Sequence, residues 1–217
     1  MALRWRCSVG IVVPHTWQHN LRMCNDYESR TSWDEYVAMT RHVDLVTPAH
    51  QGPADLPQAD DVRIGDTGAV IRAAGNGVEL APMTFGFPPP RPRAAPVFNF
   101  KSEGRHFDKS NRCLVPASAF FEFTGTKYPK AKHRFTLAGS SWMAIAALWR
   151  EGPDGPSFAM LTTAPGPDIE PYHDRQVVVL RPPQWAAWLY LTKPENELLK
   201  PLPAGSLSAE TVRVGSD

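Results

Sequence analysis

Two stretches in the first half of the chain have a clear hydrophobic pattern. In "SWDEYVAMTRHVDLV", residues 32–46, the positions Trp33, Val37, Met39 or Thr40, and Val43 recur near helical spacing, and Ser32 is a suitable N-cap. After a Pro/Gly/Asp-rich loop at 48–61, residues 69–72 and 78–83 read as strands on either side of a Gly-Asn-Gly turn at 75–77. The sequence therefore predicts a helix followed by a β-hairpin.

The second half of the chain consists of short β-rich segments separated by turn residues. These are "RCLVPASAFFEF" at 112–123, "HRFTLA" at 133–138, "WMAIAALWRE" at 142–151 and "FAMLTTAP" at 158–165. "VVVLRP" at 177–182 predicts a buried strand, "PPQWAAWLYL" at 182–191 a helix with Pro183 in its first turn, and 194–205 a short helix. The pattern predicts one α+β domain organised around antiparallel strands.

The composition changes this picture little, except in its local charge. The chain has 217 residues, 42% of them apolar, and no run near the roughly 18–20 apolar residues of a membrane span. Its three cysteines, Cys7, Cys24 and Cys113, form no CxxC pair, which favours a reduced, cytoplasmic protein without a zinc site. Residues 91–134 carry ten Lys/Arg against three acids. This excess indicates either a nucleic-acid footprint or a solvated surface balanced elsewhere.

Residues 1–22 do not have the pattern of a targeting signal. Their apolar run "VGIVV" is too short for a secretory signal, and no small-residue cleavage site follows it. Either this is an extension that is removed or disordered, or the start was assigned too early and Met23 is the true initiator. In the second interpretation, which we favour, trimming of Met23 exposes Cys24. We therefore expect a domain at 23–205 and a C-terminal tail at 206–217.

Several segments, taken in order, resemble the SOS response-associated peptidase (SRAP) family, whose members crosslink to abasic sites in DNA. They include "MCNDY" at 23–27, "RIGDTGAVIR" at 63–72, "FGF" at 85–87, "NFKSE" at 99–103, "RCLVPASAFFEF" at 112–123, "LTTAPGPDIEPYHDR" at 161–175 and "VVVLRPPQWAAWL" at 177–189. The resemblance implies a single domain built on an antiparallel sheet or open barrel with flanking short helices. It also implies that Cys24 is the mature N-terminal residue.

An N-terminal cysteine has a chemistry that an internal cysteine lacks. Its α-amine, with a pKa of roughly 7.7–8.0, is partly neutral near pH 7. The amine can condense with the aldehyde of a ring-opened abasic sugar, and the adjacent thiol can then close a thiazolidine. Without the family, a lone cysteine is more often a small buried hydrophobe.

The resemblance assigns three further catalytic residues, each with a structural alternative. Glu122 lies between phenylalanines, where a carboxyl pKa is expected to rise, and would position the amine and move protons; it could equally face water from a strand. His173 would protonate the sugar ring oxygen, or be a hydrogen-bonded structural histidine. Asn99 would orient Cys24 or the deoxyribose, or cap a turn.

The resemblance also implies contacts with single-stranded DNA. Phosphates would be held by Lys101, Arg105, Arg112 and Arg175, and a base could stack on Phe85 or Phe87, although both rings could equally be core. Four departures from the family pattern affect DNA affinity and substrate geometry more than chemistry. Asn25 and Asp26 replace Gly-Arg after the cysteine, Lys101 replaces an arginine, Gln176-Val177 replaces Met-Pro, and Phe85 replaces the tryptophan of a Trp-Gly-Leu element.

We therefore expect an SOS-response, DNA-damage protein that crosslinks abasic sites in single-stranded DNA. It would act as a monomer, without cofactor, metal or membrane, in the cytoplasm and at the nucleoid during damage. Exposure of Cys24 by self-cleavage and strand breakage through the imine (a peptidase and a lyase activity) would accompany crosslinking. The alternatives are a thiol peptidase or amidohydrolase that uses the same residues on another substrate, and a DNA-binding module that does not crosslink.

Overall fold

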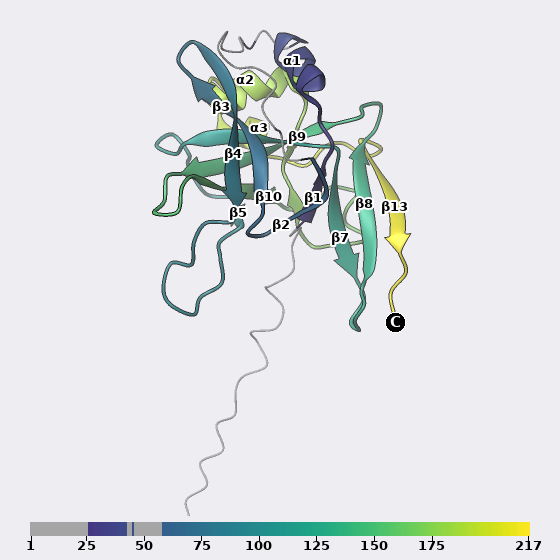
Figure 1. Ribbon diagram of the computed structural model, residues 1–217. Helices are drawn as coiled ribbons and strands as arrows, with labels where there is room; N and C mark the ends of the chain where they lie inside the picture. Colours follow the sequence, from purple (N-terminus) through teal and green to yellow (C-terminus); the bar gives the residue numbers. More distant parts are fainter. Residues whose placement is uncertain (1–25, 43–44, 46–57) are drawn as a thin grey trace, which may run out of the picture.

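A computed structural model of the chain describes residues 26–42, 45 and 58–217, which form two β-sheets and three helices (Figure 1). The first sheet is antiparallel throughout. Its strands, in spatial order, are β13 (Leu207–Arg213), β8 (Ala131–Leu137), β7 (Ala119–Thr124), β1 (Asp26–Ser29) and β2 (Ala59–Arg63).

The second sheet curls into a ring. Its order is β11 (Gln176–Val177), β10 (Ser157–Thr163), β4 (Gly77–Phe85), β3 (Thr67–Ala74), β6 (Arg112–Ala117), β9 (Met143–Arg150) and β12 (Val179–Leu180). Because β9 also pairs with β10, the strands from β10 through β4, β3 and β6 to β9 close on themselves. β10 is parallel to β4 and to β5 (Asn99–Lys101), and the other pairings are antiparallel. The predicted α+β class is confirmed.

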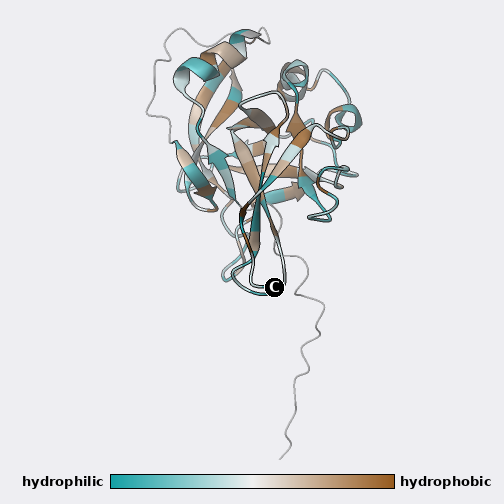
Figure 2. Cartoon of the chain, turned by 90° about the vertical axis from the view of Figure 1, so that its right-hand side faces the viewer, coloured by the Kyte–Doolittle hydropathy of each residue, from teal (hydrophilic) through white to brown (hydrophobic). Residues whose placement is uncertain are grey.

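Three strands of the second sheet, β6, β9 and β10, are buried at nearly every position, as expected for strands covered on both faces. Alternate residues enter two clusters. Ile71, Leu114 and Leu161 pack with Trp185 and Trp188, whereas Val115, Ile145 and Phe158 pack with aromatic residues of the first sheet. Figure 2 shows the brown, hydrophobic strands inside a layer of more hydrophilic loops.

The two longer helices begin as the sequence predicts. α1 (Trp33–His42) opens with a reciprocal cap: the Ser32 hydroxyl accepts the Glu35 N–H at 3.3 Å, and the Glu35 carboxylate accepts the Ser32 N–H at 2.8 Å. α2 (Pro182–Tyr190) has prolines in its first turn and ends at Leu191, where φ is 49°. α3 (Glu195–Leu198) is a single turn.

Two predictions need correction. The segment "VVVLRP" is not one strand, because Val177 pairs with β10 and Val179 with β9, so the chain crosses between two neighbours. Residues 206–217, expected as a tail, contain β13, which pairs with β8 from Leu207 to Arg213. β13 is an edge strand in which only Leu207 is buried. Because its other side chains face solvent, its sequence lacks the alternation of apolar and polar residues that predicts a strand.

Candidate active site

Glu122 is completely buried in the middle of β7. β7 lies between β1 and β8, and Glu122 is directly opposite His133 of β8. Because side chains alternate along a strand, Glu122 shares its face of the sheet with Phe120 and Thr124. Of the two sequence interpretations of Glu122, a strand-face glutamate pointing to water does not apply.

His133 connects this face of the first sheet to the segment that carries His173. Its Nε2 lies 2.7 Å from the Thr124 hydroxyl and its Nδ1 lies 3.0 Å from the Thr211 hydroxyl. The ring of Tyr172 packs on His133, with centroids 4.8 Å apart, and on Phe135 at 5.1 Å. Burial lowers the pKa of His133. Tyr172 therefore packs on the face from which Glu122 projects, and His173 is the next residue along the chain.

The hydrogen bonding of His173 determines which ring nitrogen carries its proton. Nδ1 accepts the backbone N–H of Arg175 at 3.0 Å, so in the neutral ring the proton is on Nε2. Asp174 Oδ1 also lies 3.0 Å from Nδ1, and it can pair with this nitrogen only when the ring is protonated. The His173 side chain is 16% exposed, which leaves it some access to solvent and substrate.

Asn99 lies beside the same segment. It begins β5 opposite Met160 of β10, and two residues later Lys101 lies opposite Thr162. Arg175 donates to the Thr162 hydroxyl at 3.1 Å and forms a bidentate pair with Glu103 at 2.6 and 2.8 Å. The Arg175 hydrogen bonds hold the pKa of Glu103 below its usual range. The strand of Asn99 and the segment 172–175 thus meet along β10.

The three predicted catalytic residues that the structure describes lie on different elements: Asn99 on β5 of the second sheet, Glu122 on β7 of the first sheet, and His173 in the segment between β10 and β11. The fourth, Cys24, lies outside the described residues, two positions before the first residue of β1. In the described part of the chain, no group of three or more metal-ligating side chains is close enough to hold an ion, and no helix is long and apolar enough to cross a membrane.

Comparison with known proteins shows the family to which this fold belongs. The profile of the SOS response associated peptidase (SRAP) family matches residues 23–215. The chain belongs to the SRAP family.

Individual relatives agree with the family assignment. Over 117 residues the chain is 32% identical to the abasic site processing protein YoqW of Bacillus subtilis and to the protein of the same name from Bacillus phage SPbeta. Each match covers 48% of this chain and half the length of the relative. A Bordetella bronchiseptica crystal structure is similar over 88% of this chain and all of its own, with 25% identity and a TM-score of 0.67. A Bacteroides thetaiotaomicron protein shares the fold at 16% identity and a TM-score of 0.65, over 88% of this chain and 92% of its own.

The predicted DNA contacts of this SRAP chain differ in accessibility. Lys101 and Arg105 are exposed, and Arg105 lies over the Phe100 ring at 5.9 Å. Arg175 is largely engaged with Glu103. Arg112 donates to five backbone carbonyls, including Phe107 at 2.7 Å and Trp188 at 2.9 Å. Lys101 and Arg105 are therefore the members of the set best placed to meet a phosphate.

Phe85 and Phe87, proposed from sequence to stack on a base, are core residues. Phe85 is fully buried and stacks on Phe158 with centroids 5.1 Å apart. Phe87 is 4% exposed, and Arg150 lies over its ring at 4.0 Å. The alternative that both rings are ordinary core is correct, because a base cannot reach a buried ring.

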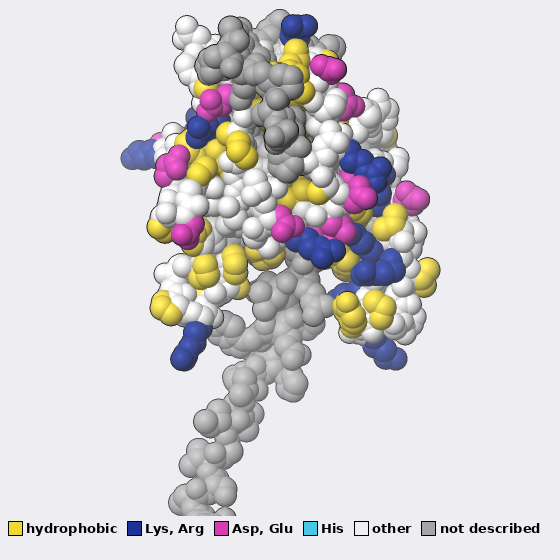
Figure 3. All heavy atoms as spheres, viewed as in Figure 1, with side chains coloured by type: hydrophobic (Ala, Val, Ile, Leu, Met, Phe, Trp, Pro, Cys, Tyr) yellow, Lys and Arg dark blue, Asp and Glu magenta, His cyan; other side chains and the backbone are white. Residues whose placement is uncertain are grey.

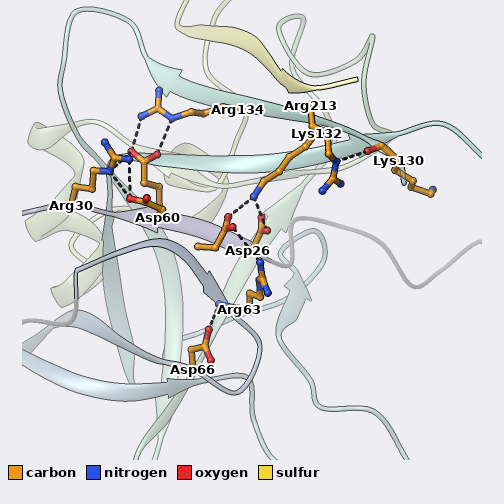
Figure 4. A network of polar contacts seen from close by, with 11 residues as sticks. Asp26, Arg30, Asp60, Arg63, Asp66, Lys130, Lys132, Arg134 and Arg213 are labelled. Carbon is orange, nitrogen blue, oxygen red and sulfur yellow. Dashed lines mark hydrogen bonds and ion pairs between the residues drawn. The ribbon is translucent and has the colours of Figure 1, made fainter. Parts of the chain in front are cut away.

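The acid at position 26, a departure from the family pattern, belongs to a charge network (Figure 4). Lys132 Nζ lies 3.2 Å from Asp26 Oδ2 and also pairs with Asp61. Burial raises the pKa of Asp26, and Lys132 partly opposes this effect. Nearby, Arg134 holds the buried Glu28 through two hydrogen bonds of 3.0 and 2.7 Å. The Asp26 charge is thus compensated within the fold, instead of facing a DNA phosphate alone.

Sequence reasoning missed His133, Tyr172 and Lys132. Each matters because of a contact with another element of the fold. His133 lies opposite Glu122 in the pairing of β7 with β8, and Tyr172 packs on His133. Lys132 forms ion pairs with Asp26 of β1 and Asp61 of β2. The one available signal was the position of Lys132 and His133 in the strand that follows the Glu122 segment.

Proposed function

We propose that this SRAP chain processes abasic sites in single-stranded DNA by forming a covalent thiazolidine through Cys24. The observation that carries the proposal is the complete burial of Glu122 on the sheet face against which Tyr172, the residue before His173, packs. A fully buried carboxyl group beside a histidine is costly for folding alone and is typical of proton-transfer sites. The names of the Bacillus relatives point to the same substrate.

Chain connectivity supports the participation of Cys24. β1 begins at Asp26 and pairs with β7, which carries Glu122. Cys24 precedes the first residue of β1 by two positions, and two peptide units span at most about 7 Å. This short connection supports a role for the Cys24 amine and thiol next to the strand that carries Glu122.

The reaction divides between the groups as follows. Protonated His173, whose Nδ1–H pairs with Asp174, donates its Nε2 proton to the sugar ring oxygen. The bond from C1 to the ring oxygen breaks while the C1 hydroxyl gives its proton to Glu122, and the sugar opens to the aldehyde. The Cys24 amine attacks the aldehyde carbon, and loss of water gives an imine. The thiol then adds to the imine carbon while its proton passes to the nitrogen, which closes the ring. Glu122 relays protons between these steps, and Asn99 holds the amine or the sugar.

Two further activities belong to the same proposal. Removal of residues 1–23 by self-cleavage would account for the peptidase in the family name. Elimination from the imine, before the thiol adds, would break the DNA strand as a lyase. The protein would act as a monomer, since the proposed chemistry requires only one Cys24 end group for each lesion.

The test is a denaturing gel of the protein incubated with an oligonucleotide that contains one abasic site. Wild-type protein should give a band that resists denaturation, and Cys24→Ala should give none. Glu122→Gln should slow adduct formation at least about 100-fold, the lower range of general acid–base catalysis. Glu210→Gln, an exposed glutamate on the same sheet, is the matched control and should react normally.

The outcomes separate the proposal from its alternatives. Absence of an adduct with protein shown by mass to begin at Cys24 would refute crosslinking. Salt-sensitive binding that survives Cys24→Ala, again without adduct, would indicate a DNA-binding module. Hydrolysis of peptide substrates without any DNA adduct would indicate a thiol hydrolase.

A further inference from the structure

The hairpin between β7 and β8 ends in an exposed aromatic residue between lysines. Residues 125–130 connect the two strands, and Tyr128 at their tip is 87% exposed, the most exposed aromatic side chain of the described residues. Lys127 precedes it and Lys130 follows two positions later, and the ten residues 123–132 contain three lysines and no acid. Figure 1 shows the hairpin extending below the sheet near the C-terminus, and Figure 3 shows dark blue and yellow side chains at this corner.

The tip is held in place by the segment that follows β13. The Asp217 carboxylate accepts the N–H groups of Thr126 and Lys127, the latter at 2.7 Å, and these bonds lower the pKa of Asp217. Ser216 N–H donates to the Pro129 carbonyl at 3.0 Å, and Arg213 Nε donates to the Lys130 carbonyl at 3.1 Å. The hairpin therefore presents Tyr128 on a braced backbone, which lowers the entropy lost when a ligand binds.

The charges at the tip favour an anion. Lys127 and Lys130 form no ion pair with any residue that the structure describes, in contrast to Lys132, which is held by Asp26 and Asp61. Arg213 adds a third positive charge. The acid at the tip is Asp217, whose carboxylate accepts two backbone N–H groups and also interacts electrostatically with Lys130, so that two of the three positive charges are left without an acid of this kind.

We propose that this hairpin tip is a second contact for single-stranded nucleic acid, in which an unpaired base stacks on Tyr128 and adjacent phosphates contact Lys127 and Lys130. An exposed aromatic face between cations is the combination that binds single strands without sequence preference. A duplex would not serve, because its bases are already stacked on one another.

A DNA strand whose lesion lies at Glu122 can also reach the hairpin tip. Tyr128 is six residues beyond Glu122, so the two Cα atoms are separated by no more than about 22 Å. This span corresponds to a few nucleotides. The inference rests on the proposed function, which supplies single-stranded DNA as the ligand. It adds a contact with the DNA that flanks the lesion, at a place away from the catalytic residues.

The experiment measures binding of the full-length protein to a fluorescein-labelled, undamaged oligothymidine by anisotropy. Undamaged DNA separates binding from crosslinking. Tyr128→Ala should weaken binding about fivefold or more, the low end of the contribution of one base–aromatic stack. Tyr128→Phe should bind like wild type and Tyr128→Leu like the alanine variant, since only phenylalanine keeps the aromatic face. Lys127→Gln and Lys130→Gln should each reduce the slope of log affinity against log salt by about 0.7.

The results decide the two proposals separately. If Tyr128→Ala binds within twofold of wild type, or if leucine substitutes fully for tyrosine, the tip is not a stacking site, whatever the protein does to abasic DNA. If wild type forms no adduct with an abasic oligonucleotide while Tyr128→Ala still loses affinity, the crosslinking proposal fails and the second contact stands. Adduct formation at saturating DNA should be equal in wild type and Tyr128→Ala.

Discussion

Arg112 provides a direct contrast between a phosphate contact and a structural arginine. Its guanidinium reaches the Trp188 and Leu189 carbonyls near the end of α2, and the Phe107, Asp108 and Ser110 carbonyls of the loop before β6. The last carbonyls of a helix have no partner within it, and a cation there is favourable. Burial lowers the pKa of Arg112, as expected for a group withdrawn from solvent by its own fold.

Arg112→Met keeps the length of the aliphatic stem and removes the donors. The substitution removes the two shortest hydrogen bonds of Arg112, 2.7 Å to the Phe107 carbonyl and 2.9 Å to the Trp188 carbonyl. At about 1–2 kcal/mol for each, the variant should lose about 2–4 kcal/mol of unfolding free energy. For a chain of this size that is a fall of about 4–16 °C in Tm.

The assay pairs thermal unfolding with salt-dependent DNA binding, and Lys101→Gln is the matched control. Lys101 is exposed, so its variant should keep Tm within about 2 °C and reduce the salt slope by about 0.7. Arg112→Met should do the reverse, with a large fall in Tm and an unchanged slope at a temperature where it is folded. A normal Tm together with a reduced slope for Arg112→Met would show that it binds phosphate and would refute the structural role.

Two further predictions concern pH. Burial lowers the folded-state pKa of His133, so between that value and about 6.5 the unfolded chain binds more protons than the folded chain. The free energy of unfolding should therefore fall as pH drops below about 6.5. In urea unfolding at stepped pH, His133→Asn should lose less stability than wild type over this range, and equal losses would contradict the assignment. The folded-state pKa of Glu103 is also lowered, chiefly by its hydrogen bonds with Arg175. Its contribution to the free energy of unfolding is therefore fully present above about pH 4.5 and is lost as pH falls through the lower, folded-state pKa. Glu103→Gln should remove that acid-dependent component and, by releasing Arg175, alter the pH profile of adduct formation, whereas an unchanged profile would show that the pair does not influence the site.

Local signals in the sequence were sufficient for elements whose stability is local. The Ser32–Glu35 cap, the Gly-Asn-Gly hairpin and the prolines of α2 each depend on residues within one turn of chain, and the structure has all three. β13 (Leu207–Arg213) was missed because its exposed residues are held by pairing with β8, a partner more than 60 residues away.

The candidate site shows the same division. Glu122, His173 and Asn99 were chosen from sequence because their segments resemble a family, and the match of residues 23–215 to the SRAP profile confirms that family. Their placement in the fold depends on contacts that no local pattern contains, namely the register of β7 with β8, the packing of Tyr172 on His133, and the pairing of β5 with β10.

The sequence alone determined the chemical groups available to this protein and the secondary structure of most segments, since both follow from residue type and short-range spacing. The tertiary structure decided which of those groups are accessible. It assigned Phe85 and Phe87 to the core, engaged Arg112 with backbone carbonyls, and left Lys101, Arg105 and Tyr128 exposed. Burial and pairing arise from residues far apart in the chain, and an identical side chain can therefore be a structural partner in one place and a ligand contact in another.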